Sequence, residues 1–205
     1  VFVTLPPPTV QDVSAIGIGL TSSTIQYTTT GATSVKIYYG QTSGFGAVIE
    51  SPTSTSTSTY LAQLKDLRDG TKYFYKVNTF DASGFEYDGT TLSFDTPPAP
   101  KIINLRFQPV EGEKSSTQLI SWETNVPSTS ELSYGIQGGE TLTSLDTTLT
   151  LSHEVIIKDL VDDSIYTLVA RSRDAAANLV TSDSQTFKTA LDTRPPKVSE
   201  VTVVA

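Results

Sequence analysis

The sequence contains no cysteine, no methionine and a single histidine. Without cysteine the chain has no disulfide, no thiolate nucleophile and no cysteine-based metal site. One histidine leaves little scope for a Ser-His-Asp relay or for a metal cage built from histidines. No apolar run approaches the roughly 18 residues that a membrane-spanning helix needs. These absences argue against an enzyme, against a metal or cofactor site and against membrane insertion.

Charge is also scarce and mainly negative: 18% of the residues are charged, and the net charge at pH 7 is −8. Nucleic-acid phosphates are bound by clustered lysine and arginine, and anionic membrane surfaces attract the same residues. Neither is therefore an expected partner. We expect partners among proteins, including neighbouring repeats or other copies of this chain, or among glycans.

Serine and threonine are abundant instead, with 24 and 32 residues among the 205. The chain also has 9 tyrosines and 8 phenylalanines, and β-branched and aromatic side chains favour strands. Short runs of alternating apolar and polar residues are separated by turn signals, which is typical of antiparallel strands with one buried face. No segment sustains the 3.6-residue period of a helix. The sequence predicts an all-β fold with no significant helix.

Two copies of one unit lie in tandem. Residues 116–135 resemble residues 23–40 at an offset of 95, and the tripeptide Lys-Asp-Leu recurs at 65–67 and 158–160. A recurring pattern of this length indicates a repeated domain, and the proline-rich segment 97–100 marks the boundary between the copies.

These matches predict one domain over residues 8–97 and a second over residues 98–192. Residues 1–7 repeat the end of the first domain, which predicts the last strand of a preceding repeat or an N-terminal linker. Residues 193–205 repeat the start of the second domain, which predicts a linker and the first strand of a following repeat. Together with the missing methionine, these ends predict a fragment of a longer array.

Each unit carries an aromatic residue in its second strand, and a leucine six residues before a tyrosine that begins a later strand. These residues are Tyr27, Leu67 and Tyr73 in the first unit and Trp122, Leu160 and Tyr166 in the second. The pattern resembles the fibronectin type III family, of the kind found in bacterial secreted and cell-surface proteins, although Tyr27 replaces the usual tryptophan. The resemblance implies two tandem seven-stranded antiparallel β-sandwiches, immunoglobulin-like and without disulfides, with these six residues in the cores. It also implies a corner hydrogen bond from each of the two later tyrosines.

The resemblance implies a fold and an extracellular or cell-surface location. It implies no particular reaction or ligand, because this sandwich hosts many unrelated functions. We predict a non-catalytic structural or adhesive spacer that is extracellular or on the cell surface. One alternative is a subunit of a self-assembling surface filament or layer. Another is an accessory module of a secreted hydrolase or of a glycan-binding protein.

Some surface features could bind a ligand or carry a modification. Phe45, Phe85 and Tyr87 fall in loops of the first unit and are candidates for glycan contact. The Ser/Thr run at residues 51–59 reads as a solvated loop or edge strand, or as an O-glycosylated tract of an exported protein. Long uncharged threonine-rich edges can also pair with a neighbouring chain.

Ionisable residues offer weaker candidates. Asp81, Glu86 and Asp88 lie within eight residues and suggest a weak calcium site, but they lack the alternating ligands and terminal glutamate of an EF-hand loop. His153 opens a predicted strand, and a lone histidine there is expected on the surface or rim of the domain, with no catalytic role.

Overall fold

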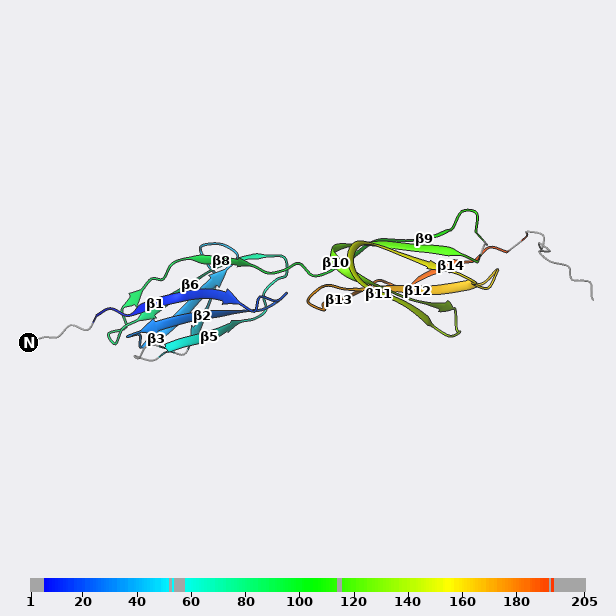
Figure 1. Ribbon diagram of the computed structural model, residues 1–205. Helices are drawn as coiled ribbons and strands as arrows, with labels where there is room; N and C mark the ends of the chain where they lie inside the picture. Colours follow the sequence, from blue (N-terminus) through cyan, green and yellow to red (C-terminus); the bar gives the residue numbers. More distant parts are fainter. Residues whose placement is uncertain (1–5, 52, 54–57, 114–115, 192, 194–205) are drawn as a thin grey trace, which may run out of the picture. The chain divides into compact units, whose positions relative to one another are not determined.

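The computed structural model describes residues 6–51, 53, 58–113, 116–191 and 193. The chain divides between Ala99 and Pro100 into two compact units, which are described separately below. Throughout the described residues the regular structure is β-strand, and the all-β prediction is confirmed (Figure 1). Apart from Pro6, Pro7 and Thr193, the two predicted terminal half-repeats lie outside the described residues.

Unit 1 is a sandwich of two antiparallel sheets. One sheet has the order β1-β2-β5, built from Thr9–Ile16, Ser23–Thr30 and Ser58–Leu64. The other has the order β4-β3-β6-β7, with β8 also paired to β6. Its strands are β3 (Ser34–Gly40), β4 (Ala47–Ser51), β6 (Lys72–Phe80), β7 (Glu86–Tyr87) and β8 (Leu92–Asp95). Because β7 and β8 both pair with β6, they form one interrupted last strand, and unit 1 has the predicted seven-strand layout.

Unit 2 builds the same sandwich from longer strands. Its strands are β9 (Ile102–Pro109), β10 (Gln118–Ile136), β11 (Leu142–Ile157), β12 (Ile165–Arg173), β13 (Leu179–Thr181) and β14 (Gln185–Lys188). The first part of β10 pairs with β9, its second part pairs with β12, and β11 follows it along both parts. Register shifts between Glu123 and Ser130 mark the crossing, because strands pass from one sheet to the other at bulges. Strands β10 and β11 therefore each combine two of the seven strands predicted for this unit.

Each unit has its own hydrophobic core between its two sheets. Both cores alternate along the strands, so that every second side chain points inward. The core of unit 1 is formed chiefly by Ile25, Tyr27, Val35, Ile37, Leu64, Leu67, Tyr73, Tyr75, Val77 and Phe94. The core of unit 2 is formed by Ile120, Trp122, Leu132, Ile157, Leu160, Tyr166, Leu168, Ala170 and Phe187. All six residues singled out as core from the sequence are thus placed in these clusters.

A tyrosine ties down the same turn in both units. The hydroxyl of Tyr73 accepts a hydrogen bond from the backbone N–H of Arg68 at 2.9 Å. The hydroxyl of Tyr166 accepts one from the backbone N–H of Val161, also at 2.9 Å. Each bond joins the start of a strand to the loop five residues earlier, and this is the corner bond that the resemblance implied.

The backbone repeats its unusual conformations as well. Left-handed φ angles recur at positions that match between the units and that fall in bulges and turns. These pairs are Asp12 and Asn104, Asp66 and Asp159, Gly70 and Asp163, and Gly84 and Ala177. Asp12 and Asn104 lie at the register shifts of β1 and β9, and short polar side chains tolerate this conformation better than most. The repeat detected in the sequence therefore extends to the bulges and turns.

Candidate binding faces

The outer face of the β3–β6 sheet in unit 1 carries a lysine that lies against two neighbouring aromatic rings. The Lys76 ammonium lies 5.2 Å from the ring centre of Tyr38 and 5.6 Å from that of Phe45. It also forms an ion pair with Asp88, and its hydrogen bond to that carboxylate holds the pKa of Asp88 below its ordinary value. Cation–π contacts at exposed sites contribute about 0.5–1 kcal/mol each. These contacts therefore join Lys76 on β6 to Tyr38 on β3 and to Phe45 in the loop after β3.

A buried amide beside this lysine organises the carboxylates. The Asn78 side-chain NH2 donates to Glu86 at 2.8 Å and to Asp88 at 2.6 Å, and its carbonyl oxygen accepts from the Gly89 N–H at 3.1 Å. The Tyr38 hydroxyl donates to the same Glu86 oxygen at 2.9 Å, which raises the pKa of Tyr38. Glu86 and Asp88 are therefore used to fasten β7 to β6.

Asp81 caps its own loop. One carboxylate oxygen accepts from the N–H and hydroxyl of Ser83 at 2.8 and 2.6 Å and from the N–H of Phe85 at 3.0 Å. These donors, the Ser83 hydroxyl first, keep the pKa of Asp81 below its ordinary value. Asp174 occupies the matching loop of unit 2 and accepts from the N–H groups of Ala176 and Asn178, both at 2.9 Å. Asp81 is thus bonded within its own loop, and among the described residues no group of three or more acidic or histidine side chains lies together in a way that could hold a metal ion.

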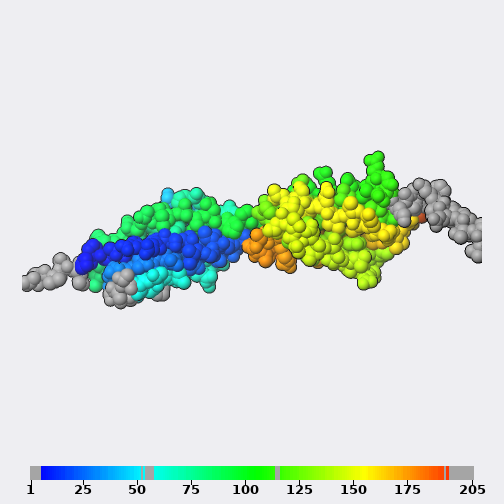
Figure 2. Space-filling view, viewed as in Figure 1, coloured from blue at the N-terminus to red at the C-terminus, as the bar shows by residue number. Residues whose placement is uncertain are grey.

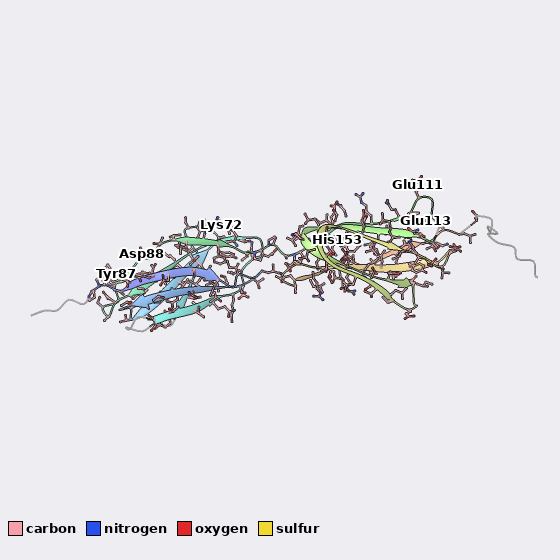
Figure 3. The ribbon with its side chains drawn as sticks, in the orientation of Figure 1. Lys72, Tyr87, Asp88, Glu111, Glu113 and His153 are labelled. Atoms are coloured by element: carbon pink, nitrogen blue, oxygen red, sulfur yellow. The ribbon has the colours of Figure 1, made fainter. Side chains whose placement is uncertain are left out.

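The structure brings together two of the three aromatic residues predicted to contact a glycan. The rings of Phe85 and Tyr87 meet edge to face at 5.0 Å, and Phe85 is 63% exposed. Glu86 lies between them in sequence and points to the face of Tyr38, so Tyr87 points to the opposite face of the sheet. Phe45 contacts Tyr38 with ring centres 6.3 Å apart. Phe45 and the pair Phe85–Tyr87 therefore lie on different faces of the sheet. The position of Tyr87 is labelled in Figure 3.

Tyr87 also lines a groove between the first and last strands of unit 1. This groove, of about 370 Å³, includes Val10, Val13 and Leu92. Unit 2 has a groove of about 450 Å³ in the matching place, lined by residues that include Ile102, Leu105 and Val180. Sequence reasoning missed both, because their walls come from strands more than 70 residues apart in the chain.

His153 is buried in unit 2, so its expected surface position is wrong. Its ring stacks on Trp122 with centroids 5.0 Å apart and an interplanar angle of 7°, and both residues are 1% exposed. The imidazole nitrogens bond to Ser130 at 2.8 Å and to Thr124 at 2.9 Å. The Thr124 hydroxyl already donates to the Val126 carbonyl at 2.8 Å, so Thr124 accepts from Nε2–H, while Ser130 donates to Nδ1.

This burial lowers the pKa of His153, because desolvation disfavours the charged imidazolium. The histidine is therefore a neutral part of the core. The matching residues of unit 1, Tyr27 and Tyr60, face each other across β2 and β5 and also stack, at 5.7 Å and 27°. Comparison of the two repeats was the signal that could have placed His153 beside Trp122.

A shallow hollow of about 220 Å³ lies on the outer face of the sheet that holds His153. Its polar lining comes from Asn104, Arg106, Ser121, Glu123, Ser152 and Glu154. The Asn104 amide donates to Glu123 at 2.9 Å, which links the bulge of β9 to β10. Chemically the hollow combines one cation with two carboxylates, and Trp122 and His153 point to the other side of the sheet.

Two further predictions concern the Ser/Thr run and membrane insertion. Of the Ser/Thr run at residues 51–59, only Ser51, Thr53 and residues 58–59 are described, and the proposed glycosylation falls mainly outside them. The described residues include no helix of the length and apolarity that a bilayer crossing requires.

No protein-family model matches the chain, and no curated protein sequence matches it either. Among solved structures it is similar to a two-domain fibronectin type III segment of chicken tenascin, with 13% identity over 88% of this chain and 99% of that one and a TM-score of 0.39. It is also similar to the FN1–FN3 domains of chicken CNTN1, with 12% identity over 87% of this chain and 66% of that one and a TM-score of 0.36.

The fold assignment rests on the units themselves. The order β1-β2-β5 against β4-β3-β6-β8 and the tyrosine corner are features of the fibronectin type III sandwich. Unit 2 repeats the same pairings and the same corner. The chain is therefore a tandem of two sandwiches with the fibronectin type III fold.

Proposed function

We propose that this chain is a non-catalytic, extracellular structural or adhesive spacer and part of a longer array of the same modules. The observation that carries the proposal is the use of ionisable side chains to hold the fold. His153 is a neutral core residue, Asp81 and Asp174 cap matching loops, and Asp88 pairs with Lys76. Catalytic groups need pKa values tuned for proton transfer and access to a substrate, whereas these groups are occupied by structural partners.

Repetition supports the same proposal. Each unit has a separate core and its own tyrosine corner, so each is equipped to fold on its own. Modules of this kind, joined by proline-rich segments such as residues 97–100, suit a chain that separates two attachments by a set number of units.

The first test is the intact mass of the native polypeptide, purified from its source and compared before and after protease treatment of whole cells. We expect a mass well above 22.0 kDa, further units in the peptide map, and loss of the protein when surface-exposed chains are digested. A mass close to 22.0 kDa would contradict the array. Full protection in intact cells, followed by digestion after lysis, would contradict the extracellular location.

Glycan binding is a second candidate function, favoured by the exposed Phe85 ring packed against Tyr87. It would suit an adhesive module or an accessory module of a secreted hydrolase. The test is a pull-down on insoluble polysaccharides with the unmodified protein, the double variant Phe85→Ala, Tyr87→Ala, and the control Phe45→Ala on the opposite face. Loss of binding in the double variant alone would support the candidate, and no binding by the unmodified protein would contradict it.

A further inference from the structure

The turn between β6 and β7 in unit 1 is closed by the same hydrogen bonds as the matching turn of unit 2. The backbone N–H of Asp81 donates to the Phe85 carbonyl at 3.2 Å, and that of Asp174 donates to the Asn178 carbonyl at 3.1 Å. In each turn the aspartate carboxylate also accepts from the N–H of the residue four positions later. Phe85 and Asn178 therefore occupy matching positions, and the turn closes with either side chain.

The two side chains at this position are used differently. The Asn178 amide donates to the Asp174 carboxylate at 2.8 Å and so completes its turn. The Phe85 ring is instead 63% exposed and meets the Tyr87 ring edge to face at 5.0 Å. Because unit 2 forms the turn without an aromatic residue, the turn does not require the Phe85 ring. An exposed ring on a well-bonded turn suits contact with a ligand.

A carboxylate with no lysine or arginine partner lies beside this ring pair. The Tyr87 hydroxyl donates to Oδ2 of Asp81 at 3.2 Å, whereas the shorter bonds from Ser83 and Phe85 go to Oδ1. The ion pairs formed between described residues do not include Asp81. Hydrogen bonds, that of the Ser83 hydroxyl first, hold the pKa of Asp81 below its ordinary value. Its negative charge therefore persists at mildly acidic pH.

The groove next to Tyr87 offers no cation to a ligand. Its lining includes Thr9 and Thr90, and the one charged residue of the lining is Asp88, which pairs with Lys76. In Figure 2 the blue atoms of β1 lie beside the green atoms of the last strands of unit 1, which are the two sides of this groove. A glycan that carries carboxylate or sulfate groups would therefore find no lysine or arginine in the groove lining to bind.

We propose that the ring pair Phe85–Tyr87 and the Asp81 carboxylate bind an amino sugar, with the sugar ring stacked on Phe85 and its ammonium group paired with Asp81. An aromatic ring attracts a cation to its face, and a carboxylate forms a charge-assisted hydrogen bond with an ammonium group. Both interactions favour a glycan with free amino groups over a neutral or an acidic one. This inference rests on glycan binding, the second candidate function, and specifies its ligand.

Two oligosaccharides that differ only in acetylation test the ligand class. The probes are the hexamers of glucosamine and of N-acetylglucosamine, titrated into the full chain by calorimetry at mildly acidic pH, where the free amines are protonated. We expect the glucosamine hexamer to bind about fivefold or more tightly, and Asp81→Asn to abolish that preference. Phe85→Asn, which places the unit 2 residue in the same turn, should weaken the binding of both hexamers.

Asp174→Asn is the matched control, because it removes the same charge from the matching turn of unit 2, which has Asn178 in place of Phe85. It should leave the preference unchanged, and thermal unfolding of the two unit 1 variants checks that they stay folded. Equal affinities for the two hexamers, or an equal loss of preference in Asp81→Asn and Asp174→Asn, would overturn the inference while glycan binding itself stands. If neither hexamer binds, the inference fails, and the pull-down on insoluble polysaccharides then decides whether glycan binding fails with it.

Discussion

The indole of Trp122 and the imidazole of His153 lie nearly parallel, with ring centroids 5.0 Å apart and an interplanar angle of 7°. The two residues face each other across β10 and β11, and the indole N–H donates to the Ser172 hydroxyl at 3.0 Å. In unit 1, Tyr27 and Tyr60 occupy the same positions. Each core therefore contains a stacked ring pair contributed by two neighbouring strands, and in unit 2 one member of the pair can be protonated.

Unit 2 should lose stability on mild acidification because of His153. Its folded-state pKa is lowered below 6.5, so between that lowered pKa and about 6.5 the unfolded chain binds a proton that the folded unit does not. Stability is therefore fully present above about pH 6.5 and falls as the pH drops through this window, by at most about 1.4 kcal/mol per pH unit. The measurement is the urea midpoint of unit 2, followed by Trp122 fluorescence from pH 7.5 to pH 5.

The variant His153→Phe is the control for this slope. It keeps a ring against Trp122 but leaves the Ser130 and Thr124 hydroxyls without their partner, so unit 2 should be less stable at pH 7.5 and insensitive to pH above 5. A midpoint of the unmodified protein that does not move between pH 7.5 and pH 5 would show that His153 is not a neutral core residue.

Truncation of the tryptophan should nearly unfold unit 2. Trp122→Ala removes a ring that is 1% exposed, and such truncations cost about 3–5 kcal/mol. Because the variant lacks the only tryptophan, the loss should be followed by circular dichroism during thermal unfolding. Trp122→Phe keeps part of the packing but loses the bond to Ser172, so its melting temperature should lie between that of Trp122→Ala and that of the unmodified protein. A drop in melting temperature of only a degree or two for Trp122→Ala would contradict its core position.

Each tyrosine corner should stabilise only its own unit. Tyr166→Phe leaves the Val161 N–H without its acceptor and should cost about 1 kcal/mol in unit 2, and Tyr73→Phe should do the same in unit 1. Chemical denaturation of both variants, with Tyr134→Phe as a half-buried tyrosine control, measures the difference. If the denaturation midpoints of Tyr166→Phe and Tyr73→Phe equal that of Tyr134→Phe, the corner hydrogen bonds do not stabilise the units.

A negative charge at position 78 should loosen the last strand of unit 1. Asn78→Asp replaces an amide that donates to Glu86 and Asp88 with a third carboxylate. The lost bonds and like-charge repulsion should destabilise unit 1 by about 1–3 kcal/mol at pH 7. Repulsion should raise the pKa of the new carboxyl group, so stability should recover as the pH falls and that group takes up a proton.

The comparison variant is Asn178→Asp, which makes the same substitution in unit 2, where the Asn178 amide donates to Asp174 at 2.8 Å in the loop before β13, and it should therefore leave unit 1 unchanged. Differential proteolysis at pH 7 and pH 5 distinguishes the units, because cleavage sites in each can be assigned by mass. Equal protection of unit 1 in Asn78→Asp and in the unmodified protein would show that the amide does not hold β7.

The sequence by itself determined the strands, the repeat and the class of fold. Those features are local: alternation along a strand decides which side chains can share a face, and the spacing from Leu67 to Tyr73, repeated from Leu160 to Tyr166, marks one turn and the strand after it. The same local chemistry favours Asp, Asn or Gly where the backbone is left-handed, as at Asp66 and Asp159, although Ala177 adopts this conformation as well.

Only the tertiary structure decided which residues meet. His153 is buried because strand register places it opposite Trp122, and Phe45 is separated from Phe85 and Tyr87 because alternation on β7 turns Tyr87 to the other face. The place of β11 at the end of its sheet likewise depends on the strand order of that whole sheet. These relationships join residues some 30 to 40 positions apart, and no local pattern in the chain specifies the register between such strands.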